Sequence, residues 1–123
     1  MEGKRFYLQP EGMIFDAALG VMELQKGKER ANDPLHGELY FDVVLFGIFW
    51  KLGFKVRRID NDRSCVIFSI KDSVKKDDDD CRDVLESMIT NEFALLDSVL
   101  LAGTPRTITY KEAGSTKMEA KVL

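Results

Sequence analysis

The stretch DPLHGELYFDVVLFGIFWKLG, residues Asp33 to Gly53, decides the fold that we predict for this chain. Wound as a helix, it would be apolar on every side, and such a helix belongs in a protein core or across a membrane. The residues that make it so are Leu39, Tyr40, Phe41, Val43, Val44, Leu45, Phe46, Ile48, Phe49, Trp50 and Leu52. The run from Leu39 to Trp50 contains Asp42 and is shorter than the about 20 apolar residues that a membrane span needs. We therefore predict a central core helix.

The flanking residues of this stretch suit a helix. Asp33 offers an N-cap, and Pro34 stands at the first helical position. Gly37 leaves open a start at Glu38 instead, and Gly53 suits the left-handed residue after a helix.

The segment before the central helix predicts a second helix over Met13–Leu24, because its apolar residues recur at helical spacing. Gly20 lies inside this helix, where it costs about 1 kcal/mol relative to Ala, so we expect a close helix contact there. Gly27 is a natural stop. Residues 5–9 form either a short strand or, with the rest of 1–11, a loosely attached arm.

The segment after the central helix predicts a hairpin and a long helix. Phe54–Ile59 and Ser64–Ile70 have strand composition and flank a polar turn. An apolar stripe from Cys81 to Leu100 then predicts helix over residues 79–102, and Thr90-Asn91 leaves open a division into two helices. Alternation in 106–111 and 116–122 predicts a second hairpin.

The order of these elements predicts an α+β fold: helix, helix, hairpin, one or two helices, hairpin. We expect a four-stranded antiparallel sheet with the helices packed on one face. The 123 residues are expected to form a single domain.

The composition excludes some functions. A net charge of -3 disfavours a dedicated nucleic-acid binder, which usually carries a basic excess. Two cysteines, Cys65 and Cys81, are too few for a disulfide framework, and no secretory signal is evident. We therefore expect reduced thiols and a cytoplasmic protein.

We predict no catalytic residues, no cofactor and no metal site. The aspartates at 77–80 lack the ligand spacing and the glycine of a calcium loop and suit the start of a helix. His36, Cys65 and Cys81 lack the close pairs of a zinc site. Common nucleotide-binding and hydrolase motifs are missing, which does not exclude an enzyme but leaves no reaction to propose and favours a non-enzymatic protein.

One local cluster of basic residues is a candidate for binding an anionic partner. It consists of Lys51, Lys55, Arg57 and Arg63, with Arg58 beside them. The alternative interpretation is a solvated outer sheet face whose charges prevent edge-to-edge pairing.

The run LGFKVRRI at 52–59, the hairpin through Ile70, the helix from Cys81 to Gly103 and the run ITYKEAG at 108–114 together resemble the 4-vinyl-reductase domain. That family is related in fold to subunits of the TRAPP vesicle-tethering complex. The resemblance covers roughly residues 35–122 and implies helices, hairpin, helices and hairpin, with apolar ligand binding or a dimerising scaffold role. The family's cysteines near the last hairpin are absent, since Ala113 and Ala120 stand in that region, so no functional residue is carried over.

Three functions follow as hypotheses. The first is a protein-interaction module, a homodimer or a subunit of a larger assembly, that associates through an apolar helical face. The second is a sensor or carrier of an apolar small molecule held between helices. Candidates for the interface or pocket are Phe15, Leu19, Phe41, Leu45, Phe49, Trp50, Met88 and Leu95. The third is a nucleic-acid-binding regulator that uses the basic hairpin.

Overall fold

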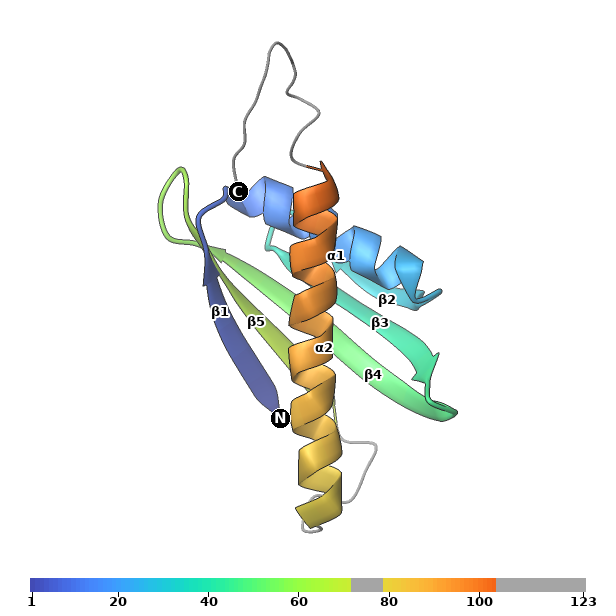
Figure 1. Ribbon diagram of the computed structural model, residues 1–123. Coiled ribbons are helices and arrows are strands. Elements are labelled where there is room, and N and C mark those ends of the chain that lie inside the picture. Colours follow the sequence, from blue (N-terminus) through green and yellow to red (C-terminus); the bar gives the residue numbers. More distant parts are fainter. Residues whose placement is uncertain (72–78, 104–123) are drawn as a thin grey trace.

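The computed structural model describes residues 1–71 and 79–103. Along the chain lie β1 (Glu2–Tyr7), α1 (Glu11–Leu24), β2 (Lys28–Asp33), β3 (Glu38–Leu45), β4 (Ile48–Arg58), β5 (Ser64–Lys71) and α2 (Asp79–Gly103). The strands form one five-stranded antiparallel sheet in the order β1-β5-β4-β3-β2, and both helices cover the same face of it (Figure 1). The α+β class is confirmed, but the predicted four-stranded sheet with a central helix is wrong.

The predicted helix over Asp33–Gly53 is replaced by the β3–β4 hairpin. Leu45 and Ile48 are paired across a two-residue turn, in which Phe46 and Gly47 both have a positive φ, 57° and 74°. This is the geometry of the primed turns that join twisted antiparallel strands. In a strand, successive side chains point to opposite faces of the sheet. Near the Phe46-Gly47 turn, both faces of this hairpin carry apolar side chains, so the sequence there is apolar without a break.

The start of that predicted helix is a turn as well. Asp33 accepts hydrogen bonds from the backbone N–H of His36 at 3.2 Å and contacts its Nδ1 at 2.7 Å. Gly37 has φ of 66°, and an added Cβ would lie 2.3 Å from the Val56 carbonyl oxygen. Aspartate side chains bond nearby backbone N–H groups in β-turns as well as at helix starts. Asp33 and Pro34 therefore fit a turn as well as the helix start that we predicted.

Several other predictions are confirmed. Residues 11–24 form α1, the β4–β5 hairpin contains the predicted strands, and the long last helix is present as α2. The division of this helix at Thr90-Asn91, which the sequence left open, does not occur, since α2 is continuous. An added Cβ at Gly20 would lie 3.0 Å from Val99 of α2, as the expected close helix contact requires. Residues 2–7 pair along β5 as an edge strand. The predicted second hairpin lies outside the described residues.

The core lies between the helices and the inner face of the sheet, which is the face that they cover. A row of phenylalanine rings crosses it from β3 to α2. Phe41, Phe54, Phe68 and Phe93 follow one another with ring centroids 6.2, 4.9 and 6.2 Å apart. Because aromatic rings bury large apolar areas, this row joins three strands and the long helix into one apolar layer.

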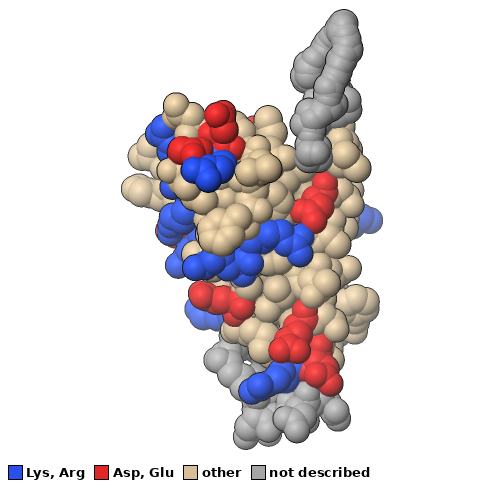
Figure 2. All heavy atoms as spheres, turned by 60° about the vertical axis from the view of Figure 1, so that its left-hand side comes forward, with Lys and Arg blue, Asp and Glu red and all other residues tan. Residues whose placement is uncertain are grey.

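The β1 edge of the sheet is charged. On the side that carries β1, Lys and Arg side chains form a band with acidic side chains above and below it (Figure 2). Within β1, Arg5 pairs with Asp97 of α2 at 2.7 Å, and the Tyr7 hydroxyl donates to the same carboxylate at 2.8 Å. Charged side chains on an edge strand disfavour pairing with another sheet, and these contacts also fix β1 to α2.

Candidate functional site

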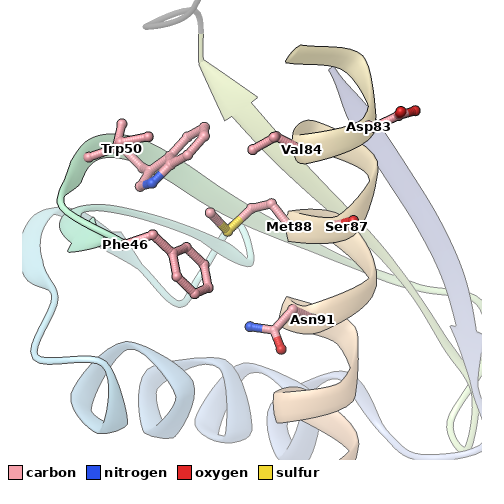
Figure 3. A pocket seen from close by; sticks show the side chains of 8 residues that line it. Phe46, Trp50, Asp83, Val84, Ser87, Met88 and Asn91 are labelled. Carbon is pink, nitrogen blue, oxygen red and sulfur yellow. The ribbon is translucent and has the colours of Figure 1, made fainter. Parts of the chain in front are cut away.

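A half-open pocket of about 510 Å³ lies between the β3–β4 hairpin and the first half of α2 (Figure 3). Its walls are mainly apolar, with a few polar groups from the helix. It is lined by Phe46, Ile48, Trp50, Asp83, Val84, Ser87, Met88 and Asn91. Its volume falls within the range of small-molecule sites, which are concave and mostly apolar.

Local structure explains how these side chains meet. Ile48 and Trp50 are two residues apart on β4 and therefore point to the same face of the sheet. Val84, Met88 and Asn91 follow the i, i+4, i+7 spacing of one helix face and point from α2 toward the hairpin (Figure 3). The tight turn presents Phe46 at the end of the pocket, opposite Asn91.

The indole of Trp50 forms the fixed inner wall. It is fully buried, and its Nε1–H donates to the carbonyl of Leu45 at 3.2 Å. Since its only polar group is satisfied within the hairpin, the indole presents an apolar surface. Met88 is also buried and adds a flexible side chain that can adapt to a bound shape.

The outer wall is not covered. Phe46 is 82% exposed, and Val84 is 46% exposed. Asp83 points away from the space in Figure 3, whereas Asn91 points into it. The pocket therefore combines apolar walls with one inward neutral amide, and no carboxylate among its described lining faces the interior.

A buried carboxyl lies next to Asn91 in the sequence of α2. Glu92 is fully buried and accepts a hydrogen bond from Nε2 of Gln25, just beyond α1, at 2.5 Å. Within the described part of the chain, its other oxygen has no partner. Burial raises the pKa of Glu92 to about 7, although the bond from Gln25 lowers it somewhat. The hydrogen bond between Gln25 and Glu92 connects the end of α1 to α2. Because the buried carboxyl is destabilising when it is ionised, its effect on folding stability depends on pH.

A second hollow of about 420 Å³ lies on the outer face of the sheet, which is the face without helices. We call it the cationic hollow. It is lined by Arg30, Tyr40, Lys51, Leu52, Gly53, Lys55, Ser69, Ile70 and Lys71.

The predicted basic cluster is divided by the fold. Lys51 and Lys55 line the cationic hollow. Arg57 pairs with Glu38 at 3.1 Å, and Arg63 pairs with Asp60 at 2.6 Å in the β4–β5 turn. The two lysines are thus the part of the cluster that faces a concave surface.

The predicted apolar candidates are also dispersed. Trp50 and Met88 line the pocket, whereas Phe15 and Phe41 are core residues. Phe49 lies exposed on the outer face. The remaining candidates pack half-buried against the core; these are Leu19, Leu45 and Leu95.

Sequence reasoning missed most of the pocket. Phe46, Ile48, Val84, Ser87 and Asn91 were not singled out, because they join only when the hairpin meets α2. One signal was available for Phe46: a Phe-Gly pair between two β-branched and aromatic runs fits a two-residue hairpin turn.

No protein-family model and no curated protein sequence matches this chain. Solved structures do resemble it. Ara h 8.0201 is 12% identical with a TM-score of 0.56, over 84% of this chain and 97% of its own. The Zhui aromatase/cyclase from Streptomyces sp. R1128 is 12% identical with a TM-score of 0.48, over 83% and 91%. A START superfamily protein from Mycobacterium smegmatis is 9% identical with a TM-score of 0.41, over 81% and 92%.

The first of these similarities gives the fold, which is Bet v1/START-like. The resemblance to the 4-vinyl-reductase domain and TRAPP subunits is therefore wrong. That resemblance depended on a helix directly before the β4–β5 hairpin, where the structure places strand β3 and the first half of β4. A hairpin followed by a helix is common to many folds, so the rest of the pattern was not specific.

Among the side chains that the structure describes, those of residues 1–71 and 82–103, no three His, Cys, Asp or Glu are grouped so as to hold a metal ion. Neither of the two helices in that part of the chain is long and apolar enough to cross a membrane.

Proposed function

We propose that this protein binds a neutral, apolar small molecule in the pocket between the β3–β4 hairpin and α2. The observation that carries this proposal is the pocket itself: about 510 Å³ of space whose apolar side chains remain partly exposed to water. Covering such surface is favourable by about 25 cal/mol per Å² of apolar area.

The chemistry of the walls supports a neutral ligand. Asn91 points into the space and can donate or accept one hydrogen bond, which would orient a hydroxyl or carbonyl group. An ionised ligand would lose hydration against Phe46, Ile48 and Val84 without an opposite charge to replace it, which costs several kcal/mol. An apolar molecule with one polar end fits these walls best.

The fold supports the same proposal. A Bet v1/START-like fold suggests that the chain binds a hydrophobic ligand. In this chain the pocket lies between the sheet and α2. Ser87 is a lining hydroxyl, but the chain's one histidine, His36, contacts Asp33 in the β2–β3 turn. This arrangement favours binding over catalysis by a serine-histidine pair.

Trp50 makes the proposal directly testable, because it is the chain's one tryptophan and lines the pocket. We expect N-phenylnaphthylamine, a neutral apolar fluorophore, to quench Trp50 emission and to receive its energy in a saturable titration. Val84→Arg should place a charge at the pocket wall and weaken binding at least about tenfold, which is 1.4 kcal/mol.

Ile59→Arg is the matched control for this substitution. Ile59 is 46% exposed, like Val84, and follows the end of β4 that lies farthest along the strand from the Phe46 turn. Its replacement should leave the titration unchanged. Equal affinities of the two variants would contradict the proposal.

A protein partner is the second candidate function, now through the hairpin and not through a helix. Val44, Phe46 and Phe49 are exposed together at the β3–β4 tip, and exposed apolar patches often mark interfaces. If the chain forms a homodimer there, Val44→Ser with Phe49→Ser should shift sedimentation equilibrium toward monomer. A wild-type monomer at micromolar concentration would contradict a homodimer.

A further inference from the structure

The cationic hollow owes its shape to Gly53. A Cβ added at this position would lie 2.6 Å from the Tyr40 ring and 3.1 Å from the Ser69 hydroxyl oxygen. The ring therefore lies close over the β4 backbone, and the longer side chains of the neighbouring positions rise around it. Any side chain at residue 53 would fill this space or displace the ring.

The lysines around the hollow lie close enough together to repel one another. Lys51 and Lys71 are direct register partners on β4 and β5, and like charges directly opposite each other destabilise a sheet. Among the described side chains, those of residues 1–71 and 82–103, neither of these lysines forms an ion pair, nor does Lys55. Folding alone gives no reason for this arrangement.

The nearby carboxylates are already engaged. Asp42 is the register partner of Lys51, but it pairs with Arg30 at 2.5 Å. Glu38 is the register partner of Lys55, but it pairs with Arg57 at 3.1 Å. Glu2 on β1 is the register partner of Ser69, which lines the hollow, and is the remaining acidic neighbour by register among the described residues. Among the described residues, the three ammonium groups around this hollow thus exceed the free negative charge beside them.

We propose that the cationic hollow binds a small soluble anion of the phosphate class, with Lys51, Lys55 and Lys71 as its cationic ligands. This site lies on the face opposite the apolar pocket and does not depend on the function proposed for that pocket. Its charges converge from two adjacent strands on about 420 Å³ of space, which suits a small phosphate-bearing molecule. A long polyanion would also meet the net charge of -3 of the whole chain.

The test is a calorimetric titration of the full chain with inorganic pyrophosphate at low ionic strength. Saturable binding is expected, and it should weaken with added salt because the lysines are at the surface. The double variant Lys51→Gln/Lys71→Gln should lose at least about tenfold in affinity, which corresponds to about 1.4 kcal/mol. Both side chains are at the protein surface, so the variant should fold, and its midpoint of urea denaturation verifies this independently of both the hollow and the apolar pocket.

Lys4→Gln/Arg82→Gln is the matched control, since it removes the same charge from exposed positions on β1 and α2. This control should bind pyrophosphate within about twofold of wild type, which corresponds to about 0.4 kcal/mol. Equal losses in the two double variants would reduce the effect to overall charge and overturn the proposal, as would the absence of pyrophosphate binding. The proposal is also overturned if phosphatidylserine vesicles or single-stranded DNA bind through Lys51 and Lys71 and pyrophosphate does not compete.

Discussion

The two faces of strand β4 carry opposite chemistry although they are built from alternate residues of one segment. Trp50 and Phe54 point inward to the pocket and the core, whereas Lys51 and Lys55 point outward to the cationic hollow. A strand turns each successive side chain to the other face. One hairpin can therefore position two distinct sites, provided that its register is fixed.

That difference matters for stability as well as for binding. The inner face is held by a close-packed aromatic row, while the outer face is held by surface charges whose individual contributions are small. Substitutions of the same kind should therefore have very different effects on the two faces. Three predictions sharpen this contrast.

The largest difference in stability is expected when a phenylalanine on each face of β4 is replaced by alanine. Phe54→Ala removes a fully buried ring that packs against Phe41 and Phe68, and should cost about 3–5 kcal/mol of unfolding free energy. Phe49→Ala removes a ring that is 48% exposed on the outer face, and should cost less than about 1.5 kcal/mol. Denaturation in urea measures both values. Similar costs would mean that the two faces are not energetically distinct.

The next effect is the pH dependence of stability that comes from Glu92, a buried carboxyl in the otherwise apolar inner layer. Glu92 has a pKa of about 7 in the folded chain, raised from 4.5 by burial. The folded state therefore binds this proton more tightly than the unfolded state. The resulting stability is present below about pH 4.5 and is lost as pH rises through about 7.

Glu92→Gln should remove this pH dependence. The loss in the wild type is worth about 3 kcal/mol at most, from 1.4 kcal/mol per pKa unit. We expect the variant to gain stability relative to wild type between about pH 5 and pH 8, as measured by urea denaturation at each pH. A constant difference between the two proteins over that range would contradict the burial of an ionisable group there.

The smallest effect is expected on the outer face. Lys71→Gln removes one of two like charges that are direct partners, and should raise the unfolding free energy by about 0.2–1 kcal/mol at low salt. Added salt should abolish the gain, because the pair is screened. Lys4→Gln, whose register partner is Ile67, provides the control and should change little. A loss of stability in Lys71→Gln would mean that this lysine has a stabilising role in the sheet.

The sequence determined those elements whose apolar residues have a clear period. Ile14, Ala17, Ala18 and Val21 recur at helical spacing and form the buried side of α1, and the stripe of α2 is equally regular. The β4–β5 hairpin was also visible, since its strands alternate around a polar turn. In each case the local pattern matches the period of the element, so no distant contact was needed to identify it.

Only the tertiary structure decided what residues 33–53 become. A continuous apolar run has no period, so it fits a buried helix as well as a two-sided strand. The choice depends on β2 and β5, whose backbone groups pair with the hairpin from both sides. β2 itself is mostly exposed and polar, so its sequence has no apolar pattern that predicts a strand.

The candidate sites depend on tertiary structure for the same reason. The pocket needs the hairpin tip and α2, which are more than thirty residues apart between Trp50 and Asp83. The sequence supplied a strong local preference for apolar residues at the tip and for lysines at alternate positions of β4. Which of them enclose a cavity follows from packing between distant segments, because the shape of a pocket is a property of surfaces that meet and not of either surface alone.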